Sequence, residues 1–181
     1  LLVGIHFLTL EIGGRILGQY HQGIGVYRAH NNRLMDWIQL KGRLKSNKGF
    51  IDRYNTRQMV RTLKNKEILW YAPDHDYGRK NSVFASFFAM QKAATTIGTH
   101  LLVKTTNPTI IAFTPLRNPD GSGYTISISK GISHFSCSDA TVAAEKMNRI
   151  IEQEIMKAPD LYMWLHRRFK TRPNNMLPVY C

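Results

Sequence analysis

Short apolar runs alternate along the chain with longer segments in which apolar residues recur every three or four positions. This alternation constrains the fold strongly, because strands buried on both faces need helices to cover them. The runs that predict strands span residues 1–5, 24–28, 67–71, 109–114 and 124–129. The segments that predict helices span residues 7–17, 32–41, 56–64, 94–105 and 138–156. We therefore expect an α/β fold with a mixed, largely buried sheet flanked by helices.

Two of the predicted strands differ in their expected exposure. Residues 110–113 are apolar throughout, which predicts burial on both faces. Residues 124–129 read Tyr-Thr-Ile-Ser-Ile-Ser, an alternation that predicts one exposed face and a place near the sheet edge. The last predicted helix has Ser138 or Asp139 as its N-cap and a single apolar stripe, so it should pack one face on the sheet.

The chain has the length of one domain, which we assign to residues 1–181. It starts inside an apolar run and without Met, so we expect an N-terminal part of the catalytic domain and a membrane anchor to be missing. No apolar run approaches the roughly 18 to 20 residues that span a bilayer. Residues 174–181, rich in Asn and Pro, predict a loose tail.

The net charge of the chain indicates the class of molecule that it binds. Lys and Arg number 25 against 12 Asp and Glu, which gives a formal net charge of +13. Such a field attracts phosphates, anionic lipid surfaces and acidic proteins. The sign alone does not choose among nucleic acid, membrane and protein.

The two cysteines, Cys137 and Cys181, are far apart and have no Cys-x-x-Cys or Cys/His spacing. Neither a zinc site nor a disulfide framework is therefore predicted, and a reducing compartment is the simplest interpretation.

The first catalytic candidate is His6, which follows an apolar strand and precedes Glu11 by five residues. In one regular helix a step of five residues would turn the two side chains about 140° apart. If His6 lies instead in the turn between strand and helix, the Glu11 carboxylate can reach one imidazole nitrogen while the other faces a substrate. That pairing suits a general base. A bare His-x4-Glu more often consists of a half-buried histidine and an exposed helical glutamate.

The second candidate is the polar segment after the predicted strand 67–71. Ligands of α/β sheets gather beyond the carboxyl ends of strands, so Asp74, His75 and Asp76 are well placed for a site. A substrate-positioning role ranks above metal binding, because no further ligand stands at suitable spacing. A solvated turn is the alternative.

Two basic clusters are the third candidate. One comprises Lys41, Arg43, Lys45 and Lys48, and the other comprises Arg167, Arg168, Lys170 and Arg172. The second lies beside Tyr162 and Trp164, and cations with aromatic residues suit lipid headgroups at a bilayer surface. The same composition suits RNA, and a solvated basic face remains an alternative for the first cluster.

Four segments together resemble one family. They are Val-Gly-Ile-His-Phe-Leu-Thr-Leu-Glu-Ile-Gly-Gly-Arg at 3–15, Tyr-Arg-Ala-His-Asn-Asn at 27–32, Trp-Tyr-Ala-Pro-Asp-His-Asp-Tyr-Gly at 70–78 and Met-Trp-Leu-His-Arg-Arg-Phe-Lys-Thr-Arg-Pro at 163–173. They are similar to segments of the lipid A biosynthesis acyltransferases of Gram-negative bacteria, in particular the lauroyl and palmitoleoyl acyltransferases.

The resemblance implies a glycerolipid-acyltransferase-like fold and an enzyme of lipopolysaccharide biosynthesis. Such an enzyme transfers an acyl chain, by overall similarity lauroyl, from acyl carrier protein to a hydroxyl of a 3-hydroxyacyl chain on the Kdo-bearing lipid A precursor. By the same resemblance His6 is the general base and Glu11 its orienting carboxylate. Arg43 stabilises an oxyanion or phosphate, and Asp74 positions the substrate.

The resemblance also implies the partners and the location. The partners are acyl carrier protein, the lipid A precursor and the inner-membrane surface at its cytoplasmic face, with no nucleic acid. Because a thioester is already activated, no metal or redox cofactor is expected.

Two alternatives stay open. A glycerol-phosphate or lysophospholipid acyltransferase uses the same dyad, but typically with Asp in the second position and without the closing Trp-Leu-His-Arg-Arg-Phe. A basic RNA-binding domain would place cations and aromatic rings on one sheet face, whereas the predicted strands are mainly aliphatic. Separately, four residues either line an acyl pocket or belong to the core: Phe84, Phe87, Phe88 and Met90.

Overall fold

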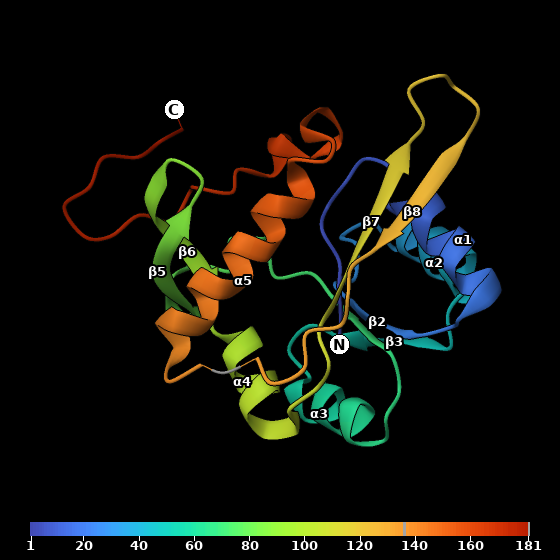
Figure 1. Cartoon of the computed structure of the whole chain (residues 1–181), viewed down its shortest axis with the longest axis horizontal. Coiled ribbons are helices and arrows are strands. Elements are labelled where there is room, and N and C mark those ends of the chain that lie inside the picture. The colour runs from blue at the N-terminus through green and yellow to red at the C-terminus, as the bar shows by residue number, and fades with distance from the viewer. Residues whose placement is uncertain (136, 181) are drawn as a thin grey trace.

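The computed structural model describes residues 1–135 and 137–180, and its main element is a six-stranded sheet (Figure 1). The strand order is β3-β2-β4-β1-β7-β8. The strands are β1 (Leu2–Val3), β2 (Ile24–Tyr27), β3 (Gly49–Asp52), β4 (Leu69–Tyr71), β7 (Ile111–Arg117) and β8 (Tyr124–Ile128). Neighbours are parallel except β7 and β8, which form an antiparallel pair. The predicted mixed sheet is confirmed, and β8 is an edge strand as its alternation indicated.

Five α-helices of the described residues accompany the sheet: α1 (Leu10–Tyr20), α2 (Arg33–Leu44), α3 (Thr56–Lys64), α4 (Gly98–Thr106) and α5 (Ala140–Ile155). Side chains at three N-caps accept backbone N–H groups of the first turn and so fix where the helices begin; they are Asn32, Asn55 and Asp139. Of the two predicted caps of the last helix, Asp139 is therefore the one used. No helix among the described residues is long and apolar enough to cross a bilayer.

Helices α1 and α5 contact β7 from opposite faces of the sheet. A Cβ on Gly13 of α1 would lie 2.4 Å from Pro115, so only glycine lets the helix approach this closely. On the other face, the Thr114 hydroxyl donates to the Glu154 carboxylate of α5 at 2.5 Å. Because alternate residues of a strand point to opposite faces, these contacts place one helix on each side of the sheet.

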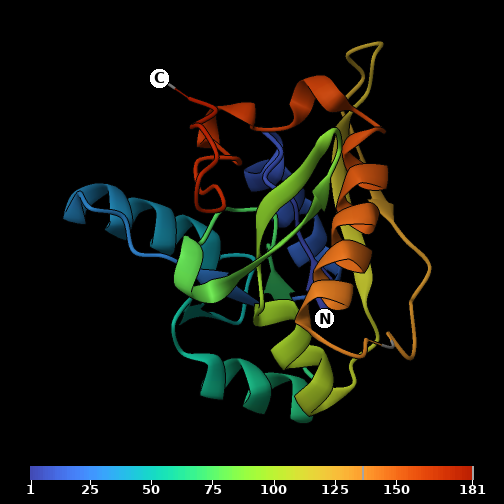
Figure 2. The same cartoon turned by 90° about the vertical axis from the view of Figure 1, so that its left-hand side faces the viewer.

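A separate antiparallel hairpin lies outside the six-stranded sheet and was not predicted from the sequence. It consists of β5 (Ser82–Phe87) and β6 (Met90–Thr96), and α5 packs against it (Figure 2). The predicted helix over residues 94–105 is therefore wrong at its start, since residues 94–96 belong to β6 and α4 begins at Gly98. Ala93 and Ala94 favour helix by themselves, but both are completely buried in pairing with β5, and tertiary packing overrides the preference. The short strand β3 was missed as well.

The largest buried cluster joins β1 and α5 with the hairpin and with Ile110, the residue before β7, through side chains such as Val3, Met147 and Ile151. Phe87 is fully buried in this cluster, and Phe88 and Met90 pack against it. These residues therefore belong to the core, while the partly buried Phe84 has the Arg79 guanidinium over its ring.

The chain after α5 folds back onto the hairpin. Three-residue 3-10 turns at Pro159–Leu161 and Trp164–His166 lead to Arg168, which is completely buried. Its guanidinium donates to the Ala94 carbonyl at 2.6 Å and the Thr95 hydroxyl at 3.0 Å, and it lies over the Phe87 ring. Arg168 therefore fixes the hairpin and does not contact a headgroup, which corrects one of the expected lipid contacts. Beyond Pro173 the described residues form neither helix nor strand.

Arg168→Ala should lower the free energy of unfolding by about 3 kcal/mol, because it removes a charged donor from two buried acceptors. Urea denaturation measures this change. The control is Arg167→Ala at the exposed neighbouring position, which should change stability by less than about 0.5 kcal/mol. Equal losses in the two variants would contradict the buried role of Arg168.

Candidate active site

His6 lies in the segment between β1 and α1, where neighbouring segments hold it on two sides. On one side, the Trp70 ring of β4 packs so close to Gly4 that a Cβ there would lie 2.2 Å from it. On the other, the Met163 amide donates to the His6 carbonyl at 2.9 Å, and the Leu8 amide donates to the Leu161 carbonyl at 2.8 Å. These contacts fix the backbone of His6 independently of its side chain.

The Asp74 carboxylate binds His6 twice. One oxygen accepts from the His6 backbone N–H at 2.9 Å, and the other lies 2.8 Å from Nδ1 of the imidazole. Asp74 has no exposed surface, and the His6 side chain is 21% exposed. Since an ionised carboxylate only accepts, Nδ1 carries the proton, and Nε2 is left with a free lone pair.

The pair alters the pKa of both members. Burial alone would raise the pKa of Asp74, but the charge of His6 and its two hydrogen bonds outweigh burial and hold that pKa well below its ordinary value. Burial alone would lower the pKa of His6, yet Asp74 outweighs burial and raises it, against a smaller opposing effect of Arg43. His6 is therefore a stronger base than a free histidine.

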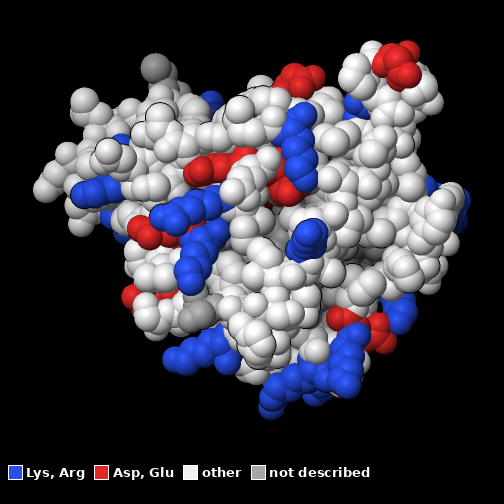
Figure 3. Space-filling model, in the orientation of Figure 1, with Lys and Arg blue, Asp and Glu red and all other residues white. Residues whose placement is uncertain are grey.

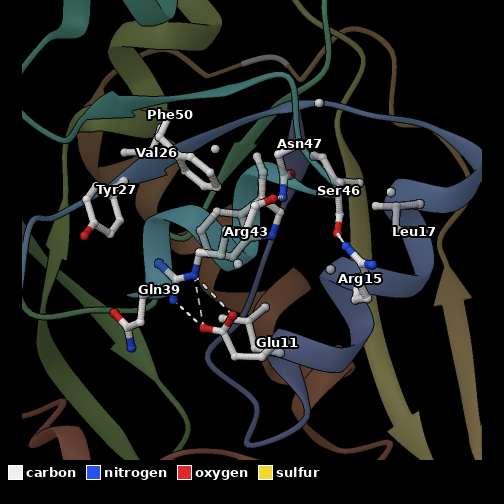
Figure 4. Close-up of a pocket in the computed structure, with 18 of the residues that line it drawn as sticks. Glu11, Arg15, Leu17, Val26, Tyr27, Gln39, Arg43, Ser46, Asn47 and Phe50 are labelled. Carbon is white, nitrogen blue, oxygen red and sulfur yellow. Dashed lines mark hydrogen bonds and ion pairs between the residues drawn. The ribbon is translucent and has the colours of Figure 1, made fainter. Parts of the chain in front are cut away.

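Glu11 pairs with Arg43 and not with His6. Glu11 is the second residue of α1, and Arg43 lies in the last turn of α2. The guanidinium donates through Nε at 3.1 and 3.2 Å and through Nη2, and this pair raises the pKa of Arg43 (Figure 4). The expected contact between Glu11 and the imidazole is thus replaced by Asp74. Because α1 begins only at Leu10, its first turn directs Glu11 toward α2.

Two further histidines surround His6. The His75 ring stacks on it with centroids 3.8 Å apart, and the His166 ring meets His75 edge-on at 4.3 Å. Nε2 of His166 lies 3.1 Å from the Tyr162 hydroxyl. Burial lowers the pKa of His75 to about 3 and that of His166 to about 4, with the charge of His6 adding to both, so both rings are neutral near pH 7.

Among the described residues, His6, His75 and His166 are the set whose ligand atoms lie close enough to hold a metal, within 4.8 Å of one another. The rings of His6 and His75 lie face to face, at an interplanar angle of 24°. Their in-plane lone pairs therefore run side by side instead of converging on a point about 2 Å from each nitrogen, as a bound zinc ion requires. The arrangement fits ring packing around a base better than a metal centre.

A cavity of about 640 Å³ opens beside His6, between α1, the end of α2 and β2. Figure 4 shows Glu11 paired with Arg43 on one part of its lining, Val26 and Phe50 together on another, and Arg15 beside Leu17. The cavity thus combines a charged region next to a base with an apolar wall. That combination suits a ligand with a polar reacting group attached to a hydrocarbon chain.

The closing basic segment divides into different roles. Arg167 and Lys170 are exposed, as expected for headgroup contacts. The Arg172 guanidinium donates to the Lys92 carbonyl at 3.2 Å. The backbone carbonyl of Arg172 accepts from the Arg79 guanidinium at 2.6 Å, so Arg172 connects the closing segment to the hairpin. Of the four predicted contacts, Arg167 and Lys170 remain available to a ligand.

His6, Glu11, Arg43 and Asp74 were all expected at the site from the sequence, and the structure brings them to one region in two pairs. The pairing of His6 with Asp74 could not be predicted, since 68 positions separate them and the parallel pairing of β1 with β4 brings them together. The stacking of His75 and the position of His166 were missed for the same reason. His75 was a candidate through its place after the predicted strand 67–71, and for His166 the available signal was its place in the segment 163–173.

The acid stability of the protein should depend on Asp74. Since its folded-state pKa is lowered, the pair stabilises the fold above about pH 4, and this contribution is lost as the pH falls toward the folded-state value. The raised pKa of His6 acts in the other direction: its contribution is present below about pH 6.5 and is lost as the pH rises through the folded-state value.

In Asp74→Asn the free energy of unfolding should therefore fall less steeply between about pH 5 and pH 2 than in the wild type. Urea denaturation at a series of pH values measures the slope. An unchanged slope in Asp74→Asn would contradict the ionised pair.

Comparison with known proteins follows the same segments. The sequence model of the family described as bacterial lipid A biosynthesis acyltransferase matches residues 1–171. The chain is 56% identical to a Haemophilus influenzae protein named lipid A biosynthesis acyltransferase, over 98% of this chain and 57% of that protein. It is 50% identical to the lipid A biosynthesis lauroyltransferase of Escherichia coli, over 99% of this chain and 59% of that protein. It is 48% identical to the palmitoleoyltransferase of Escherichia coli, over 99% and 58%. The chain thus spans under three fifths of the length of these relatives.

Proposed function

Since the chain belongs to the family of bacterial lipid A biosynthesis acyltransferases, we propose that it transfers an acyl chain to a lipid A precursor. The donor is acyl carrier protein, and the acceptor is a hydroxyl of a 3-hydroxyacyl chain on the Kdo-bearing precursor. The reaction takes place at the cytoplasmic face of the inner membrane. The 50% identity to a lauroyltransferase supports a lauroyl donor, and the 48% identity to a palmitoleoyltransferase makes palmitoleoyl the alternative.

The observation that carries the proposal is the free Nε2 of His6 at the cavity, with Asp74 on Nδ1. Nε2 takes the proton of the acceptor hydroxyl as its oxygen attacks the thioester carbon. Asp74 stabilises the imidazolium that forms, without taking its proton. When the tetrahedral intermediate collapses, the C–S bond breaks, and the leaving thiolate of the carrier receives the proton from Nε2. No step consumes a further reactant.

Arg43 is placed to meet negative charge in this reaction. It lines the same cavity as His6 and lies near enough for its charge to lower the pKa of that residue. A fixed cation beside the reacting carbon stabilises the oxyanion of the intermediate, or a phosphate of the acceptor. Glu11 holds the guanidinium through two of its nitrogens, so Glu11 is a positioning residue for Arg43.

The cavity and the charge of the chain fit these substrates. Val26 and Phe50 offer an apolar wall for a hydrocarbon chain, while Arg15 and Arg43 offer charge to phosphates and sugar-acid carboxylates. Acyl carrier protein is acidic, and the net charge of +13 favours its approach.

The RNA-binding alternative is less well supported. Figure 3 shows Lys and Arg gathered over α3 at the lower edge, whereas over α5 they alternate with Asp and Glu. A strand-based RNA platform needs cations and stacking aromatic rings on one sheet face. The cations of this chain lie mainly on helices and in connecting segments.

His6→Ala should lower kcat by about 10³-fold, because a lost general base costs about 10²- to 10⁴-fold. Asp74→Asn should lower it by about 10²-fold or more, because the ring loses its fixed tautomer. The assay follows lauroyl transfer from lauroyl-acyl carrier protein to the Kdo-bearing precursor in detergent, with circular dichroism to verify folding. Glu67→Gln, which breaks only a surface pair with Lys48, is the control and should keep the wild-type rate.

The same assay separates the role of Glu11 from that of Asp74. Glu11→Ala and Arg43→Ala should each lower kcat, and the double variant should be no slower than Arg43→Ala alone, since Glu11 acts through Arg43. Fully additive losses would indicate that Glu11 acts on His6 and not through Arg43.

A folded His6→Ala protein that retained the wild-type rate would exclude His6 as the general base. Transfer to lysophospholipid alone would favour the phospholipid acyltransferase.

A further inference from the structure

Helix α2 has its polar and apolar faces reversed relative to an ordinary surface helix. None of its twelve residues, all of which the structure describes, is buried. Of its four partly buried residues three are polar, Asp36, Gln39 and Arg43, and the fourth is Leu40. Asp36 accepts from the Tyr27 hydroxyl and from the His30 amide at 2.6 Å, and Gln39 and Arg43 line the cavity.

The outer face of α2 is apolar and basic. Its exposed apolar side chains have 44–64% of their surface accessible; they are Leu34, Met35, Trp37, Ile38 and Leu44. Positions 34, 37, 38, 41 and 45 follow the spacing of three and four that forms one stripe of a helix. Lys41 and Lys45 therefore stand on the same stripe as Leu34, Trp37 and Ile38. We call this stripe the outer face of α2.

We propose that the outer face of α2 docks on an anionic lipid bilayer. This deepens the proposed function and rests on it, because it names the surface through which a lipid substrate reaches the site. A bilayer interface accepts apolar side chains and tryptophan below its headgroups, while its phosphates pair with lysine. The outer face has this composition, and the Lys41 ammonium already lies 4.7 Å from the centre of the Trp37 ring.

A protein partner fits this face less well than a bilayer. A cover that buried Leu34, Trp37 and Ile38 would also desolvate Lys41 and Lys45, which then need acidic partners at two positions. Lipid phosphates supply anionic partners to both lysines at any position of the helix on the bilayer, since long lysine side chains extend from the apolar layer to the headgroups. A helix of twelve residues is about 18 Å long and therefore lies along the interface without crossing it.

The position of α2 connects this surface to the chemistry. Figure 2 shows the helix extending away from the body of the protein, so its outer face is free to meet a flat surface. The inner face of the same helix lines the cavity that contains His6 and Glu11. A bilayer on the outer face is thus about one helix diameter, roughly 10 Å, from the cavity. An acyl chain can then enter the cavity while the rest of its lipid remains in the membrane.

Flotation of the purified protein with vesicles tests the proposal without any substrate. Vesicles of phosphatidylethanolamine and phosphatidylglycerol should bind the protein, and vesicles of phosphatidylcholine should bind it more weakly. The triple variant Leu34→Ser, Trp37→Ser, Ile38→Ser should lose binding by about 10-fold or more. Lys41→Gln, Lys45→Gln should lose the preference for anionic lipid. The control replaces three exposed apolar residues elsewhere, Tyr54, Met156 and Leu177, by Ser and should bind like the wild type.

Quenching by brominated lipids locates the contact. The tryptophan fluorescence of the wild type should be quenched on binding. Trp37→Phe keeps an apolar ring, so it should still bind while most of the quenching disappears. Equal binding by the triple variant and the wild type would overturn the proposal, as would quenching that persists in Trp37→Phe. Self-association through this face without vesicle binding would also overturn it.

The two proposals can fail separately. Binding is measured without acyl donor or acceptor, so absent transfer in a protein that binds through α2 would overturn the function alone. If the triple variant still binds vesicles and also transfers the acyl chain normally to detergent-solubilised precursor, the docking face alone is overturned.

Discussion

The two bonds from the Asp74 carboxylate to His6 are the interaction on which the rest of the site depends. They connect the segment after β1 to the segment after β4, and the parallel pairing of these strands sets their spacing. The carboxylate is completely buried, and a buried charge is costly unless it is paired and hydrogen-bonded. Its pairing with His6 fixes the backbone, the tautomer and the basicity of the residue together. Nε2 is left at the cavity as the reactive atom.

Around this pair the charged groups are kept apart from one another. Arg43 is held apart from His6 by Glu11 on α1, so a cation and a base line one cavity without pairing with each other. His75 and His166 stay neutral and pack around the imidazole, which adds no positive charge to compete with protonation of His6. Helix α2 contributes to both surfaces, with Arg43 facing the cavity and Trp37 and Lys41 facing outward.

The sequence predicted the fold class and most elements because strands and helices leave local patterns. Residues 56–64 match α3, since an Asn cap and helical spacing are both local signals. The hairpin of β5 and β6 left no such signal, because its Ala93 and Ala94 favour helix until β5 and Arg168 meet them. The four site residues were candidates from their own segments, and the family resemblance assigned their roles, but the predicted pairing of His6 with Glu11 differs from the structure. Asp74 reaches His6 through the sheet, and no spacing along the chain encodes that contact.

The pairing of His6 with Asp74 is tested most directly by the protonation of the His6 ring, observed by ¹⁵N–¹H NMR of the imidazole nitrogens at a pH where the ring is neutral. The pairing predicts the Nδ1–H tautomer in the wild type and in Glu11→Gln, with its hydrogen-bonded proton lost in Asp74→Asn. Loss of that proton in Glu11→Gln and its persistence in Asp74→Asn would contradict the pairing and make Glu11 the partner of His6.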